Sequence, residues 1–114
     1  MMNDVKPIYL TDTETGMEYP LEFNRDSVVF AERRGFEIDD VGKFPMSKVP
    51  ELWFYAFRMH HKNVSREKTD KLLDKAGGWT AELLTRLGEL YAAPFEAMSD
   101  EEKAENPPTV TIKL

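Results

Sequence analysis

The sequence predicts an α+β fold, in which a small N-terminal β-hairpin packs with about four α-helices. Strand-like residues gather near the N-terminus, and the middle of the chain shows the periodicity of amphipathic helices. The last residues, TVTIKL, again alternate in the manner of a strand. A chain of 114 residues suits a single domain, residues 1–114, with one modest hydrophobic core.

The hairpin is predicted from residues 7–10 and 17–23, which the turn-forming sequence TDTETG joins. One face of the second strand should be buried, because apolar residues alternate there at Tyr19, Leu21 and Phe23. A two-stranded hairpin alone is only marginally stable in water. We therefore expect residues 109–114 to join it as a third strand, after a polar linker over residues 99–108.

The first helix is predicted directly after the hairpin, because both of its ends carry local signals. Asn24 is a typical N-cap, and Asp26 places a negative charge where the helix dipole favours it. Arg33 and Arg34 lie in the last turn, where cations are favoured. Gly35 can adopt the left-handed conformation that ends a helix. A further helical turn is expected at residues 38–41.

The second helix is predicted to be central in the fold, because it is apolar over much of its circumference. It should start after Ser47 as N-cap, hold Pro50 in its first turn and end near His61. We assign its main stripe to the core: Val49, Leu52, Trp53, Ala56, Phe57 and His60. The large side chains outside this stripe are Phe54, Tyr55 and Met59.

A third helix is predicted after Ser65 as N-cap, with Leu72 and Leu73 as its anchors and the pair Gly77-Gly78 as its stop. Its lysines at positions 68, 71 and 75 alternate with acidic residues, so we expect a solvated face. Thr80 should cap a fourth helix, in which Pro94 is expected to cause a kink or an interruption. One face of that helix is apolar: Leu83, Leu84, Leu87, Leu90, Tyr91, Phe95 and Met98.

Composition narrows the possible functions. The formal net charge is −6, so the chain has no domain-wide basic footprint for nucleic acid. It has no cysteine, which excludes disulfides, thiolate metal sites and a cysteine nucleophile. No apolar run is long enough to cross a membrane, and the N-terminus lacks the pattern of a secretion signal. We expect a cytoplasmic protein with no nucleic-acid or membrane partner.

No catalytic residue, cofactor or metal ligand is predicted from the motifs. His60 and His61 are adjacent, so on a helix they point about 100° apart and cannot easily chelate one ion. Asp39 and Asp40 lack the spacing of a calcium loop, and the Gly77-Gly78 pair lacks that of a phosphate loop. The serines that precede helices are explained by capping.

The aromatic run LWFYAF, residues 52–57, leaves two interpretations open. All of it is buried in the core, or one edge stays exposed as a partner-binding patch. A domain of this size has limited room for so many large side chains. If an edge is exposed, Phe54, Tyr55 and Met59 are the candidate partner-binding residues.

Three segments in order resemble a family of small phage proteins: YPLEFNRDSVVFAERRGFEIDDV, then FYAFRMHHKN, then LLTRLGELYAAPFEAM. These proteins are the tail assembly chaperones of phages and prophages with long, non-contractile tails. The resemblance spans about residues 19–98. It implies a non-catalytic protein that binds the helical tape-measure protein during tail assembly, with the major tail protein as a possible second partner.

Other functions stay open at this point. An acidic protein-interaction or nucleic-acid-mimic inhibitor would need carboxylates on one surface, whereas here they alternate with lysine and arginine. A small metal-dependent enzyme would have to use His60 or His61 with distant carboxylates. A homo-oligomer is possible in each case.

Overall fold

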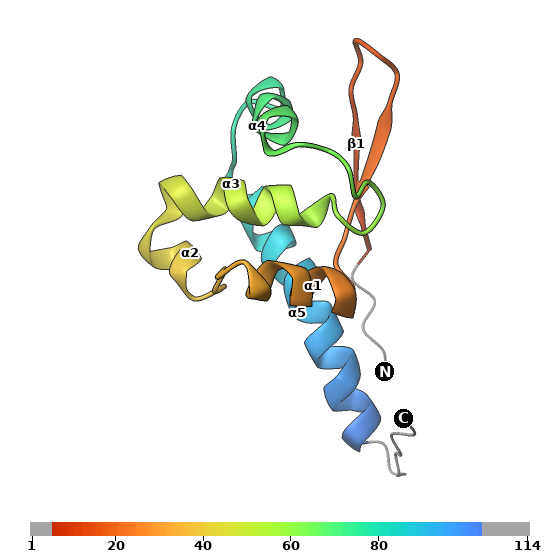
Figure 1. The fold of residues 1–114 in the computed structure, drawn as a ribbon, viewed down its shortest axis with the longest axis vertical. Coiled ribbons are helices and arrows are strands. Elements are labelled where there is room, and N and C mark those ends of the chain that lie inside the picture. Colours follow the sequence, from red (N-terminus) through yellow and green to blue (C-terminus); the bar gives the residue numbers. More distant parts are fainter. Residues whose placement is uncertain (1–5, 104–114) are drawn as a thin grey trace.

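A computed structural model describes the backbone of residues 6–103 and the side chains of residues 6–96 (Figure 1). It has the predicted α+β fold, with an N-terminal hairpin followed by helices. The strands are β1 (Ile8–Thr11) and β2 (Glu18–Leu21). The helices are α1 (Arg25–Arg33), α2 (Asp40–Lys43), α3 (Pro45–Ala56), α4 (Arg66–Lys75) and α5 (Ala81–Lys103). The predicted turn at residues 38–41 is thus found slightly later, as α2.

The hairpin is antiparallel, with Ile8 opposite Leu21 and Thr11 opposite Glu18. Tyr19 and Leu21 are buried, as the alternation in the second strand predicts, because this face packs on the helices. The predicted third strand at residues 109–114 lies outside the described residues. Among those that are described, the sheet contains β1 and β2.

Both predicted ends of α1 are confirmed. The Asn24 side chain accepts from the Ser27 N–H at 2.9 Å, and the Ser27 hydroxyl oxygen accepts from the Asn24 N–H at 2.9 Å. At the other end, Gly35 has φ +88°. The Phe36 N–H then reaches back to the Ala31 carbonyl at 3.0 Å, which closes the helix in a Schellman motif.

The predicted limits of the second helix are wrong at both ends. α3 begins at Pro45 rather than after Ser47, because proline suits a first helical position that needs no N–H partner. Pro50 consequently lies inside the helix rather than in its first turn. α3 ends at Ala56 instead of His61. The Ala56 carbonyl accepts a hydrogen bond from the Glu22 N–H at 3.1 Å. It is therefore bonded to the residue that follows β2 rather than to a further turn of the helix.

α3 forms the centre of the core, and it contacts α1, α4 and α5 (Figure 1). The predicted stripe is buried from Val49 to Phe57, but His60 is exposed and the assignment of His60 to the core is wrong. Its Nε2 lies 2.8 Å from Oε1 of Glu22, because the chain has left the helix before residue 60. The buried Trp53 donates from Nε1 to the Thr69 carbonyl at 2.7 Å and joins α3 to α4.

The predicted caps of the last two helices are confirmed. The hydroxyl of Ser65 accepts from the Lys68 N–H at 3.0 Å, and that of Thr80 accepts from the Leu83 N–H at 3.1 Å. Leu72 and Leu73 are buried. Along the predicted apolar face of α5, Leu87, Leu90 and Tyr91 are buried, whereas Phe95 is 48% exposed. The side chain of Met98 lies outside those described.

α5 continues through Pro94 to Lys103, so the expected interruption does not occur. A proline removes one N–H from the helix ladder, and the flanking turns of this 23-residue helix remain helical. Residues 99–103 are therefore helical rather than linker, and residues 104–108 lie outside the described part. Figure 1 shows the last turns of α5 extending beyond α1, away from the other elements.

Candidate functional site

The three predicted partner-binding residues lie in different environments. Tyr55 is 5% exposed, and its ring packs edge-on against Phe30 and Phe36 at centroid distances of 6.0 and 5.3 Å. The prediction that Tyr55 belongs to an exposed edge is therefore wrong, because α1 and the segment after it cover this side of α3. Phe54 and Met59 are half-buried and remain accessible.

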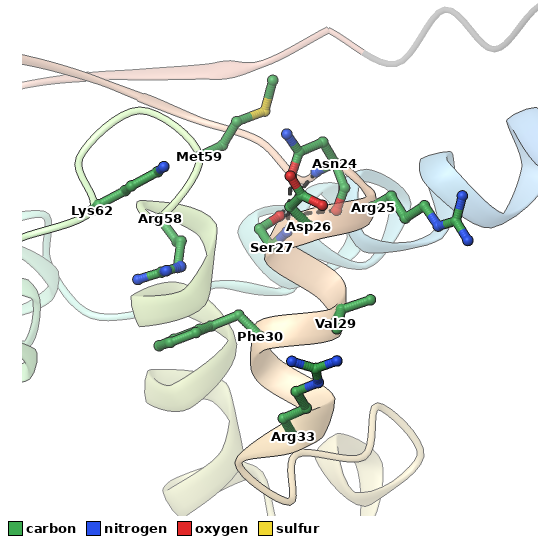
Figure 2. Close-up of a pocket in the computed structure, with 10 residues that line it drawn as sticks. All are labelled: Asn24, Arg25, Asp26, Ser27, Val29, Phe30, Arg33, Arg58, Met59 and Lys62. Atoms are coloured by element: carbon green, nitrogen blue, oxygen red, sulfur yellow. Dashed lines mark hydrogen bonds between the residues drawn. The ribbon is translucent and has the colours of Figure 1, made fainter. Parts of the chain in front are cut away.

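A groove of about 540 Å³ runs between α1 and the turns that follow α3, and Met59 lines it (Figure 2). Most of its charged side chains are basic: Arg25, Arg33, Arg58 and Lys62. The acidic residue in its lining is Asp26. We call this feature the basic groove. It is a local positive surface on a chain whose formal net charge is −6.

The groove is built from two segments far apart in the sequence. α1 contributes Arg25, Val29 and Arg33, which are spaced by four residues and so project from one side of the helix. The second wall comes from the turns at residues 57–62, which form because α3 ends at Ala56. Figure 2 shows Arg58 directed toward the Phe30 ring of α1, with Met59 and Lys62 on the neighbouring turn.

The cations that line the groove have no ion-pair partner among the described residues. The Arg58 guanidinium carbon lies 3.7 Å from the centroid of the Phe30 ring, and that of Arg34 lies 5.2 Å away. A cation–π contact holds a guanidinium in place but leaves its charge and N–H donors free for an anion. Within the described part of the chain, Arg25, Arg33, Arg58 and Lys62 make no ion pair.

Two smaller hollows extend this positive surface past Phe54. One shares Phe30, Arg58 and Lys62 with the basic groove and adds Phe54 and Val64. The other, of about 260 Å³, brings three further cations beside Phe54: Arg34, Lys48 and Arg66. Lys48 is 3.5 Å from Glu51, and Arg66 is 2.9 Å from Asp70. We call the three hollows together the basic face. Phe54 and Met59 are half-buried within it, as are Val29, Phe30 and Val64.

A more apolar hollow lies on the other side of α1, against α5. Its lining includes Val28, Val29, Pro94 and the exposed Phe95. A neighbouring hollow of about 510 Å³ adds Tyr91, whose pKa is raised to about 12 by burial. Its charged residues are Glu32, Glu37 and Asp39. α1 thus separates a positive surface from an apolar surface with an acidic border.

The two histidines are held by different neighbours. His60 pairs with Glu22, whereas the His61 ring stacks at a tilt on Tyr19 with a centroid distance of 4.8 Å. Among the described residues, no three histidine, aspartate or glutamate side chains are grouped in a way that suits a metal ion. Their geometry is that of separate structural contacts.

Sequence reasoning missed an ion cluster around the buried Asp12, in the loop of the hairpin. The Asp12 side chain is fully buried, and its Oδ1 lies 2.8 Å from Nζ of Lys75. Nζ of Lys75 is also 3.0 Å from Oε1 of Glu14, and Nζ of Lys68 is 3.8 Å from Oδ2 of Asp12. Lys68 and Lys75 therefore do not belong to a purely solvated face, whereas the exposed Lys71 makes an ion pair with Glu67.

This cluster shifts the pKa values of both main partners. The hydrogen bond from Lys75 holds the pKa of Asp12 below its ordinary value, against the opposing effect of burial. Hydrogen bonds to Asp12 and Glu14 raise the pKa of Lys75. The cluster ties the hairpin loop to α4, and it lies apart from the residues that line the basic groove.

The fold and the site define a small α+β domain whose accessible chemistry is a positive face with apolar side chains set into it. The family model described as "Domain of unknown function (DUF5055)" matches residues 2–114, so the chain belongs to this family. Searches of curated proteins and of solved structures gave no match. None of the helices in the described residues combines the length and the apolar character that a membrane crossing requires.

Proposed function

We propose that the protein is a non-catalytic assembly chaperone that binds a helical client, of the tape-measure type, while a phage tail is built. The sequence resemblance to tail assembly chaperones points to this role. The observation that carries it is the basic face, where Phe54 and Met59 stay accessible in open hollows whose charged side chains are mostly basic.

An open amphipathic surface of this kind suits a protein segment. An amphipathic helix can place apolar side chains against Phe54 and Met59, while its polar flanks meet the surrounding cations. Such contacts are individually weak and can be repeated along a long client. Phe54 and Met59 are the proposed anchors, and the ring of Phe54 contacts the ring of the buried Tyr55 at a tilt, with centroids 5.3 Å apart.

The remaining parts of the proposal rest on the same resemblance. The major tail protein is a possible second partner, the site of action is the bacterial cytoplasm, and the role requires no cofactor. Two observations favour this role over the alternatives. A nucleic-acid mimic requires an acidic surface, which the basic face interrupts. A metal-dependent enzyme would have to use His60 or His61, and these two side chains contact different neighbours, Glu22 and Tyr19.

The proposal is tested by co-expression with the tape-measure protein of the same phage or prophage, followed by a pull-down. The double variant Phe54→Ser/Met59→Ser should lose most of the bound client, since buried apolar anchors contribute about 2 kcal/mol or more each. The matched control is Phe44→Ser/Met46→Ser. Phe44 is 58% exposed and Met46 is 81% exposed, and both lie outside the basic face.

Circular dichroism and thermal melting establish first that each variant is folded. A folded Phe54→Ser/Met59→Ser variant that retains full client binding would show that the anchors are misassigned. A wild-type protein that captures no segment of the tape-measure protein would contradict the chaperone role itself.

A further inference from the structure

We propose that the basic groove binds the acidic C-terminal part of α5 from a second copy of this chain, so that copies associate head to tail. The first observation is the groove itself. Arg33, Arg58 and Lys62 gather there from distant parts of the sequence, and among the described residues none of them has an acidic partner. Carboxylates are the best match for such cations, which have no ion-pair partner within the described part of the chain.

The second observation is the distribution of acidic residues. The segment SDEEKAE, residues 99–105, contains the longest run of consecutive acidic residues in the chain, Asp100-Glu101-Glu102. Its backbone is helical as far as Lys103. Figure 1 shows this end of α5 extending away from α1, the helix that forms one wall of the groove.

These two features are complementary but occupy different parts of one molecule. A surface that meets a different surface on its neighbour forms a heterologous contact, which generates rings or open arrays. Opposite charges also steer the two surfaces toward each other during diffusion. A second copy is favoured over another acidic protein because its acidic end is present at the same concentration as the groove.

This inference goes beyond the proposed function and does not need the client. The test is sedimentation velocity on the full chain over a range of concentrations, at about 0.1 M and about 1 M salt. The Debye length falls from about 10 Å to about 3 Å between these conditions. The wild type should associate with rising concentration at low salt and should become monomeric at high salt.

Charge reversal identifies the two surfaces. Arg33→Glu/Lys62→Glu changes the groove, and Glu101→Lys/Glu102→Lys changes the acidic end. Each double variant should weaken self-association by about tenfold or more, because attraction is replaced by repulsion. The matched control is Lys43→Glu/Lys71→Glu. Lys43 ends α2 as Arg33 ends α1, and both control residues are exposed and lie outside the groove.

Mixing the two reversed variants gives the decisive measurement. The reversed, acidic groove of one variant can then bind the reversed, basic end of the other. The native groove of the second variant can bind the native acidic end of the first. Association should therefore return to near the wild-type level. The proposal is overturned if the wild type stays monomeric at low salt, or if the mixture stays monomeric. It is also overturned if the control variant weakens association as much as the groove variant. A monomeric wild type that binds an oligonucleotide through Arg33 and Lys62 would assign the groove to nucleic acid instead.

Discussion

Gly35 shows how one residue determines the end of a helix. Its φ of +88° is a conformation that side chains with a Cβ rarely adopt, and it lets the chain turn sharply after α1. That turn places Phe36 in the core, where it is 2% exposed and packs against Tyr55 and Tyr91. The left-handed glycine therefore supports the aromatic layer that buries one side of α3.

We predict that Gly35→Ala lowers the free energy of unfolding by about 1 kcal/mol. No atom lies within 4 Å of the position that the new Cβ would occupy, so the cost comes from the backbone conformation rather than from a clash. The measurement is chemical denaturation monitored by circular dichroism.

Gly88→Ala is the matched control for this prediction. Gly88 lies inside α5, has no positive φ and likewise has no atom within 4 Å of a new Cβ. Alanine should therefore stabilise the protein there by about 0.5–1 kcal/mol. Equal effects of the two substitutions would contradict the assignment of Gly35 as a left-handed cap.

At the scale of elements, the hairpin is attached to the helices at both ends. Its β2 end is held by the hydrogen bond from the Glu22 N–H to the Ala56 carbonyl, and its loop is held by the ion pair between Asp12 and Lys75. Asp12 also accepts from the Glu14 N–H at 3.1 Å, so the same carboxylate shapes the loop. A short hairpin that is marginal alone becomes part of the fold through these attachments.

We predict that Asp12→Asn destabilises the protein at pH 7 and that this difference shrinks in acid. The pKa of Asp12 is depressed in the folded state, from the ordinary value of 3.8. The stabilising contribution is therefore complete above that value and is lost as the pH falls through the folded-state pKa. Urea unfolding of both proteins from pH 7 down to about pH 2 gives the measurement.

The control for this prediction is Glu14→Gln. Glu14 contacts the same Lys75 ammonium at 3.0 Å, but its side chain is 74% exposed, so its ion pair is weakened by solvent. Glu14→Gln should therefore change the free energy of unfolding much less than Asp12→Asn does. An Asp12→Asn difference that is constant with pH would show that the buried charge does not contribute through its ion pair.

At the scale of the whole molecule, charge is separated between the basic face and the acidic end of α5. The client proposed for the basic face and the acidic end of a second copy would use neighbouring parts of the same surface. If both proposals hold, self-association and client binding compete, and the apolar anchors Phe54 and Met59 are partly covered before the client arrives.

We predict that Glu101→Lys/Glu102→Lys binds a labelled tape-measure segment with higher apparent affinity than the wild type does. The substitution removes the competing acidic end and leaves the basic face unchanged, so a larger fraction of the protein is competent to bind. Fluorescence anisotropy at increasing protein concentration provides the measurement. Weaker binding by this variant would indicate that the acidic end assists the client instead of competing with it.

Local signals in the sequence were sufficient for much of the fold. Asn24, Ser65 and Thr80 cap helices as predicted, because a cap depends on residues within one turn of it. Gly35 and the Gly77-Gly78 pair end helices for the same reason, with positive φ values. The alternation at Tyr19 and Leu21 likewise predicted which face of the hairpin is buried.

The site was only partly predictable, because it depends on contacts between distant residues. Of the predicted partner residues, Met59 and Phe54 do lie on the basic face, but Tyr55 is covered by Phe30 and Phe36. The basic groove itself had no signal in the sequence, since Arg33 and Lys62 are far apart along an acidic chain. The burial of Asp12 also depends on a partner at position 75.

The sequence by itself thus determined the fold class, the N-caps of α1, α4 and α5, the helix stops after α1 and α4, and the buried strand face. The tertiary structure decided where α3 ends, because the hydrogen bond from the Glu22 N–H to the Ala56 carbonyl joins the hairpin to the end of this central helix. That ending creates the turns that carry Arg58, Met59 and Lys62 to α1. Local periodicity acts over a few residues, whereas the basic face depends on which elements pack together, and so only the folded chain shows it.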